Sequence, residues 1–257
     1  MNIQQLWVSY ATLVRKEVKR FTRIWVQTLL PPVITMSLYF VIFGKLIGER
    51  NGTMGGTPYI AFVVPGLVMM AVINNSFSNV VSSFFSAKFN RSIEELQVSP
   101  TPSSLIIAGY VTGGVLRGLI IGGLVTLLSF AFTGIHIHHI GITFLVIMLA
   151  AVFFSLAGFI NATFANSFDD INIVPTFVLT PLTYLGGVFY SIDMLPKFGQ
   201  ILSQFNPILY LVNSFRYGML GVSDINITHA ILGLSLSVVA LYGACWFLLE
   251  KSQRLRQ

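Results

Sequence analysis

The chain has 257 residues, of which 54% are hydrophobic and only 9% are charged, with a mean hydropathy of +0.79. Soluble globular domains carry about 25% charged residues, so this composition excludes them and indicates an integral membrane protein. The formal net charge is +6, but the Lys and Arg residues lie beside the apolar runs, which indicates membrane topology rather than nucleic-acid binding. The single cysteine, Cys245, excludes an intramolecular disulfide.

Residues 1–22 predict an amphipathic helix at the membrane surface. Its apolar residues recur at three- and four-residue spacing. The basic residues of this segment and its end fall on the opposite arc: Arg15, Lys16, Lys19, Arg20 and Arg23. The pattern suits a helix held by anionic lipid, a docking surface for a cytoplasmic partner, or both.

Six apolar runs follow, and we expect each to cross the membrane. Five lie at about 24–43, 59–85, 103–132, 142–162 and 229–249, and one begins after Asp170 and ends near Tyr190. A span of about 20 apolar residues matches a hydrocarbon core of about 30 Å. The first run is too long for the core of a cleavable signal peptide, so we expect it to remain as a span. It carries Pro31 and Pro32, which should kink it.

Polar residues interrupt the second span along one helical arc: Asn75, Ser78, Asn79, Ser82 and Ser86. Such side chains either bond neighbouring helices or line a translocation path.

The third span repeats small residues at Gly114, Gly118 and Gly122, a spacing that lets two helices approach closely. Arg117 lies beside them near the middle of that span, where an arginine is costly and must face protein or water. It is either a functional residue or a buried hydrogen-bonding anchor.

The loop 86–102 between the second and third spans carries Lys88, Arg91, Glu94 and Glu95. Ser92 and Glu95 have the spacing of a capping box, which predicts a short helix along the membrane surface. A short helix between two spans suits a surface that receives mechanical force from a partner.

Three histidines follow the third span, at His136, His138 and His139. Their clustering suggests a metal, but nearby residues supply no carboxylate or thiolate to complete a site. We expect no metal site there.

Residues 191–228 do not leave the membrane cleanly. Gly186 and Gly187 precede them, Pro196 and Pro207 interrupt them, and the apolar pieces are too short to cross the bilayer. We expect re-entrant half-helices between spans five and six, with their backbone satisfied by protein or a wet cavity.

Charge counting predicts that both termini are cytoplasmic. Ten Lys and Arg residues fall in segments that a six-span chain with its N-terminus inside places in the cytoplasm, and four fall outside: Lys45, Arg50, Lys197 and Arg216. Positive residues favour the cytoplasmic side.

The chain lacks the motifs of several enzyme classes. It has no phosphate-binding G-x-x-x-x-G-K-[ST] loop, no nucleophile elbow and no H-E-x-x-H pair. Acidic residues are nearly absent from the spans, which argues against an ion-coupled secondary transporter, although Arg117 and the polar arc keep that alternative open. A histidine metalloenzyme is a further alternative. If the chain moves a solute, we expect the energy to come from another subunit.

Three stretches resemble the type-2 permease family of ATP-binding-cassette (ABC) transporters. The first comprises, in type and spacing, Leu182, Leu185, Gly186, Val188, Leu195, Pro196, Pro207, Ile208, Tyr210 and Arg216. The run RIWVQTLLPPVITMSLYFVIFG is similar to the family's first span, and RSIEELQVSPTPSSLIIAGYV is similar to its loop between spans two and three. The likeness covers nearly the whole chain, 1–257, as a single all-α transmembrane domain.

The resemblance implies a permease subunit of a bacterial inner-membrane exporter, working as a homodimer with two copies of an ABC ATPase subunit. ATP and magnesium are expected on that partner, with no cofactor or catalytic site in this chain. The implied ATPase contacts are Arg15, Lys19, Lys88, Arg91, Glu94 and Glu95. The implied outer gate comprises Gly186, Gly187, Tyr190, Pro196, Pro207 and Arg216. From polarity and spacing alone, we place at the transport path or dimer interface Asn75, Asn79, Gly114, Arg117 and Gly118.

Overall fold

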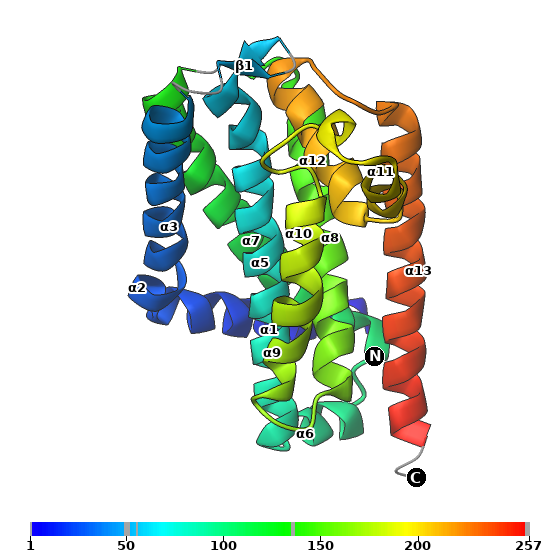
Figure 1. Ribbon diagram of the computed structural model, residues 1–257. Coiled ribbons are helices and arrows are strands. Elements are labelled where there is room, and N and C mark those ends of the chain that lie inside the picture. The colour runs from blue at the N-terminus through cyan, green and yellow to red at the C-terminus, as the bar shows by residue number, and fades with distance from the viewer. Residues whose placement is uncertain (1, 49–51, 55, 135–136, 255–257) are drawn as a thin grey trace.

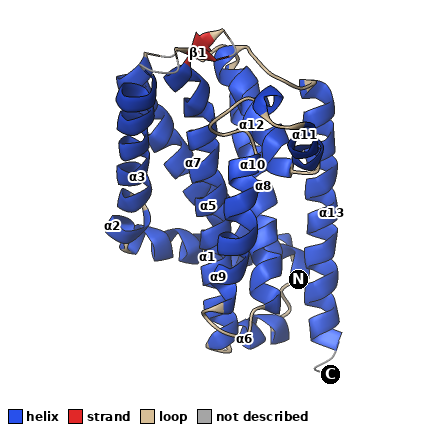
Figure 2. Ribbon diagram, in the orientation of Figure 1, coloured by secondary structure: helices blue, strands red, loops and turns tan. Residues whose placement is uncertain are grey.

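The computed structural model describes residues 2–48, 52–54, 56–134 and 137–254. Long helices run side by side along one direction, and the first helix lies across them (Figure 1). Helices account for nearly all of the regular structure (Figure 2). The predicted helical membrane fold is therefore confirmed, with five helices in the described residues that are long and apolar enough to cross a bilayer.

The crossing helix is α1, Ile3–Arg23. A capping box begins the helix: Oδ1 of Asn2 accepts a hydrogen bond from the Ile3 N–H at 2.8 Å, and the Asn2 N–H donates to Oε1 of Gln5 at 2.9 Å. The face of α1 turned to the bundle buries Leu13, Glu17 and Phe21, which lie one turn apart. Figure 1 shows α1 below the middle of the bundle, roughly perpendicular to the neighbouring long helices.

The first span is divided into α2 (Trp25–Thr28), α3 (Leu30–Val41) and a π-helical end, Ile42–Ile47. The break falls at Leu29, so Pro31 and Pro32 lie in the first turn of α3. Prolines are tolerated there because first-turn N–H groups have no helical acceptor. The predicted kink is thus a break just before the prolines.

Four further helices complete the set of five: α5 (Tyr59–Phe89), α7 (Ser103–Thr133), α8 (Ile140–Phe164) and α13 (Ile227–Arg254). Helix α5 is central, because 83% of the residues in its most apolar stretch are buried. The corresponding fraction for α13 is 11%. The core is formed where α5 packs against α7 and α8. At the end of the bundle near the start of α5, β1 (Thr53–Met54) pairs antiparallel with β2 (Thr57–Pro58).

Helix α6, Ser92–Val98, lies at the opposite end of the bundle (Figure 1). The short helix was predicted correctly, but its capping box was wrong. Arg91 is the N-cap residue, with a left-handed φ of 57°, and no side chain caps the helix. The Ser92 hydroxyl instead donates to the carbonyl of Ala87 at 3.2 Å.

The chain between α8 and α13 is the most irregular. A helical rod over residues 170–185 joins α9 (Asp170–Val174), a π-helical turn (Pro175–Leu179) and α10 (Thr180–Leu185). A 3₁₀ turn (Ile192–Met194), α11 (Lys197–Gln204) and α12 (Pro207–Leu220) follow. With 16 residues, the rod is shorter than each of the five helices that are long enough to cross a bilayer.

Candidate functional site

A buried carboxylate joins α1 to α5. Glu17 is only 1% exposed, and its Oε1 accepts a hydrogen bond from the Ser83 hydroxyl at 2.6 Å. Nε of Arg20 lies 3.4 Å from the other carboxylate oxygen. A buried charge is tolerated when it is paired and hydrogen-bonded. Arg20 lies on the same helix as Glu17, so the hydrogen bond from Ser83 is the contact that joins α1 to α5.

Two arginines continue this network up α5. Nη2 of Arg20 donates to the carbonyl and to Oδ1 of Asn79, at 2.9 and 2.7 Å. One turn further along, Nη2 of Arg117 donates to Oδ1 of Asn75 at 3.0 Å and to the carbonyl of Thr28 at 3.3 Å. Asn75 and Asn79 therefore bond neighbouring helices, and Arg117 anchors α7 to α5 and to the end of α2.

The remaining polar residues of the predicted arc form a separate line on α5. Most residues of α5 are buried, but four polar ones, each four residues from the next, are half-buried: Asn74, Ser78, Ser82 and Ser86. Asn74 was not among the residues predicted from the sequence, although its four-residue spacing from Ser78 was a usable signal. The accessible face of the most buried span is thus polar over three turns.

The glycine repeat of α7 faces helices of the same chain. A Cβ on Gly114 would meet the carbonyl oxygen of Ser76 at 3.0 Å, and one on Gly118 would collide with the Ser76 hydroxyl. Gly122 would bring a Cβ 2.7 Å from Val72. The repeat therefore lets α7 pack closely against α5. The assignment of Gly114 and Gly118 to a dimer interface or path remains a prediction.

The chain turns sharply after α10, in a segment that we call the elbow, residues 186–190. Gly187 has a φ of +71°, a conformation that side chains disfavour. Gly186 is packed against Ile208, which would lie 2.7 Å from an added Cβ. The glycines thus permit both the turn and its close contact with α12.

Arg216 of α12 fixes the elbow to α5. The residue is 1% exposed, and its Nη2 donates to the carbonyl of Gly187 at 2.7 Å. Nε donates to the carbonyl of Phe62 at 3.3 Å, and Nη1 donates to Oδ1 of Asn213 at 3.2 Å. The guanidinium also lies 3.7 Å from the centre of the Phe62 ring, a cation–π contact. Of the predicted gate residues, Arg216, Gly186 and Gly187 therefore come together.

The other predicted gate residues lie around this elbow. Tyr190 is half-buried at its end, and Pro196 immediately precedes α11. Pro207 begins α12, where the Asn206 side chain caps the helix through the Ile208 N–H at 3.0 Å. The prolines mark helix starts, as their missing N–H groups favour.

The residues predicted to contact an ATPase lie on α1 and at the α6 end of the bundle. Arg15, Lys19, Arg91 and Glu95 are exposed, and Glu94 is half-buried. Lys88 is engaged within the chain, because its Nζ donates to the carbonyls of Thr163 and Ala165 at 2.8 and 2.7 Å. Lys88 thus holds the end of α8 against α5.

Of the three histidines, His136 lies outside the described residues. The backbone N–H groups of His138 and His139 donate to the carbonyls of Met219 and Gly218, at 3.1 and 2.7 Å. The His139 ring stacks on Tyr217, with 5.4 Å between ring centres. These two residues fasten the loop after α7 to the end of α12. No group of three metal-binding side chains occurs in the part of the chain that the structure describes.

The apolar bundle and the crossing amphipathic helix define a multi-pass helical membrane protein. Residues 8–220 match the ABC-2 type transporter family model, and the chain belongs to this family. It is 56% identical over 250 residues to the inner membrane transport permease YadH of Escherichia coli K12, covering 97% of this chain and 98% of that protein. It is 23% identical over 220 residues to nodulation protein J of Rhizobium leguminosarum bv. viciae, covering 83% and 81%.

The chain is therefore the transmembrane permease of an ABC-2 type transporter in the inner membrane. Permeases of this kind lack the ATPase, which lies on a partner subunit. Family membership favours the permease over the two alternatives raised by the sequence, the ion-coupled secondary transporter and the histidine metalloenzyme.

Proposed function

We propose that two copies of this chain and two ATPase subunits form an exporter, with both termini of each chain in the cytoplasm. The rod over residues 170–185 acts as the fifth of six spans. At 1.5 Å per residue it is about 24 Å long, somewhat shorter than the hydrocarbon core. Helices α11 and α12, of 8 and 14 residues, are shorter still and act as re-entrant half-helices.

The position of α1 supports an assignment of how deep each element lies in the membrane. An amphipathic helix with a basic face belongs at the inner membrane surface. Arg20 of α1 bonds Asn79 of α5, and the 20 residue steps from Tyr59 to Asn79 rise about 30 Å, the thickness of the hydrocarbon core. The last ten residues of α5 then extend about 15 Å further into the cytoplasm.

The projection of α6 beyond α1 carries the proposal. Helix α6 follows this extension directly, so its exposed Arg91 and Glu95 lie where a soluble partner can reach them. Force applied to α6 passes into α5, and from α5 into α1 and α7 through the Glu17, Arg20 and Arg117 network. We therefore assign α6 as the coupling helix and α1 as its neighbour at the ATPase.

The half-buried polar line of α5 is assigned to the cytoplasmic entrance of the transport path, because residues beyond Asn79 lie past the inner membrane surface in this arrangement. It extends from Asn74 to Ser86, beside the arginine network at the inner surface. The elbow held by Arg216 lies toward the other end of α5 and is assigned as the outer gate. A solute moving outward would pass the polar line first and the elbow last.

Co-purification with the ATPase subunit encoded nearest to this chain tests the coupling assignment. Glu95→Arg reverses an exposed charge on α6, and we expect it to reduce the ATPase recovered with the tagged chain. Asp193→Arg makes the same change at an exposed residue near the elbow and should leave recovery unchanged. Equal recovery with both variants would remove α6 from the contact.

A further inference from the structure

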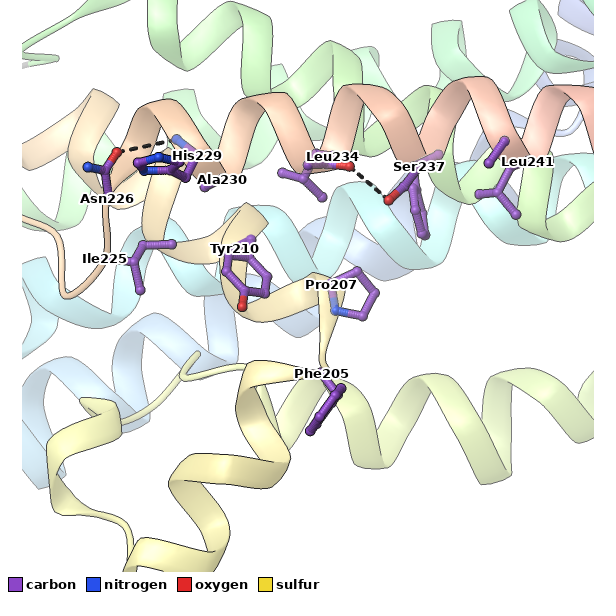
Figure 3. A pocket seen from close by; sticks show the side chains of 13 residues that line it. Phe205, Pro207, Tyr210, Ile225, Asn226, His229, Ala230, Leu234, Ser237 and Leu241 are labelled. Atoms are coloured by element: carbon purple, nitrogen blue, oxygen red, sulfur yellow. Dashed lines mark hydrogen bonds between the residues drawn. The ribbon is translucent and has the colours of Figure 1, made fainter.

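A cavity of 900 Å³ lies between α13 and the segment that leads from α11 into α12. Its α13 wall extends from Asn226, just before the helix, to Leu241. Phe205 and Tyr210 line the facing side (Figure 3). Phe153 of α8 is also part of the lining. None of the gate or network residues described above contributes to it except Pro207.

Small side chains on α13 form the floor of this cavity. The helix presents to it, at three- and four-residue spacing, Ala230, Gly233, Ser237 and Ala240. A Cβ added to Gly233 would have no atom within 4 Å, so the space beside it is open. The row makes a trough along the helix axis, and the 12 residues from His229 to Leu241 give it a length of about 18 Å.

The polar side chains of the trough that can still bond a ligand lie at one end. Asn226 and His229 lie at the start of α13, and Leu241 lies at the far end (Figure 3). The ring nitrogens of His229 have no hydrogen-bond partner among the described residues. The hydroxyls of Ser237 and Tyr210 also line the cavity, but they already donate to the carbonyls of Gly233 and Gln204, both at 2.8 Å. A ligand that matches this lining has a polar head and a long apolar tail.

The bilayer supplies such a ligand directly. Helix α13 is the least buried of the five long helices and exposes large apolar side chains beside the trough: Leu232, Leu236 and Val239. In a membrane protein these side chains face acyl chains. The trough is therefore continuous with a lipid-covered surface, and its polar end lies at the membrane-surface end of α13.

We propose that the trough binds an acyl chain of a membrane phospholipid, with the head group beside Asn226 and His229. On the orientation proposed above, the lipid comes from the outer leaflet. The tail fills the space over Gly233 and Ser237 and separates α13 from the segment between α11 and α12. This lipid site is independent of the proposed ATPase coupling, because it rests only on the membrane position of α13.

Photo-crosslinking tests the site in the full-length chain in nanodiscs of phosphatidylethanolamine and phosphatidylglycerol. Two phospholipid probes carry a diazirine on the acyl chain, one near the head group and one near the chain end. Peptide mass spectrometry should place the first probe near His229 and the second near Leu241. The reverse order, or equal labelling along all faces of α13, would overturn the proposal.

Two matched glycine variants make the test specific. Gly233→Leu fills the trough without a clash and should lower its labelling several-fold. Gly243→Leu makes the same change at another open, exposed glycine of α13 outside the cavity, and should label like wild type. Labelling that Gly233→Leu leaves unchanged would contradict the site. A second result would also contradict the site: the wild-type trough is not labelled by lipid, and Gly233→Cys in a Cys245→Ser chain cross-links two copies. That result would assign the trough to a second copy of the chain.

Discussion

Replacing Arg216 by methionine tests whether this residue holds the elbow to α5. Methionine keeps the apolar stem but removes three donated hydrogen bonds, to Gly187, Phe62 and Asn213. It also removes the cation–π contact with the Phe62 ring. The elbow would still be joined to α5 by the Tyr59 hydroxyl, which donates to the carbonyl of Phe189 at 3.1 Å, and by the close packing of Val188 against Gly66.

The size of the effect follows from these contacts. Leaving the buried Gly187 carbonyl without its donor costs about 1–3 kcal/mol. A desolvated cation–π contact contributes about 2 kcal/mol. Removing the charge also removes its own burial cost, which offsets part of the loss. We expect a net loss of about 3 kcal/mol, or roughly 6–12 °C in Tm for a chain of this size.

Thermal unfolding in detergent measures this loss. Arg15→Met changes an exposed arginine of α1 and should leave Tm within about 1 °C of wild type, because surface changes are usually within about 0.5 kcal/mol. Arg216→Lys should give an intermediate value, since one ammonium group cannot reproduce the guanidinium's three directed bonds. A Tm for Arg216→Met equal to that of Arg15→Met would refute the reasoning.

Three further substitutions, one of them a control, test the packing of α7. Arg117→Leu should leave the protein in the membrane but lower its free energy of unfolding by about 1–3 kcal/mol, because Asn75 and the Thr28 carbonyl lose their donor. Wild-type Tm, dimer fraction and transport would show that Arg117 is dispensable. Gly118→Leu should lower Tm strongly because its side chain would enter α5, whereas Gly123→Leu, at a glycine with open space, should be tolerated. Equal Tm values for the two glycine variants would contradict the close contact between α7 and α5.

Much of the fold could be predicted because apolar length and helical spacing are strong signals. The predicted spans at 59–85, 103–132 and 142–162 lie within α5, α7 and α8. The amphipathic α1 and the short α6 were also predicted. Helix ends were less accurate, since Ser92 bonds back to α5 instead of capping α6.

The polar contacts could not be predicted from spacing alone. Glu17 lies one turn from Leu13 and one turn from Phe21, on the apolar face of α1, and that position was the signal for its burial. Its partner Ser83 is 66 residues away, and only the packing of α1 on α5 brings them together. Likewise, Arg216 was predicted near the elbow, but its bond to α5 depends on how α12 folds back.

The central claim is that a separate ATPase subunit drives this permease through α6. A photo-crosslinking amino acid at Glu95, in the complex purified with its ATPase subunit, tests this claim most directly. We predict a cross-linked product containing one chain of each subunit from position 95, and none from the same probe at Asp193. Cross-linking from Asp193 but not from Glu95 would contradict the account.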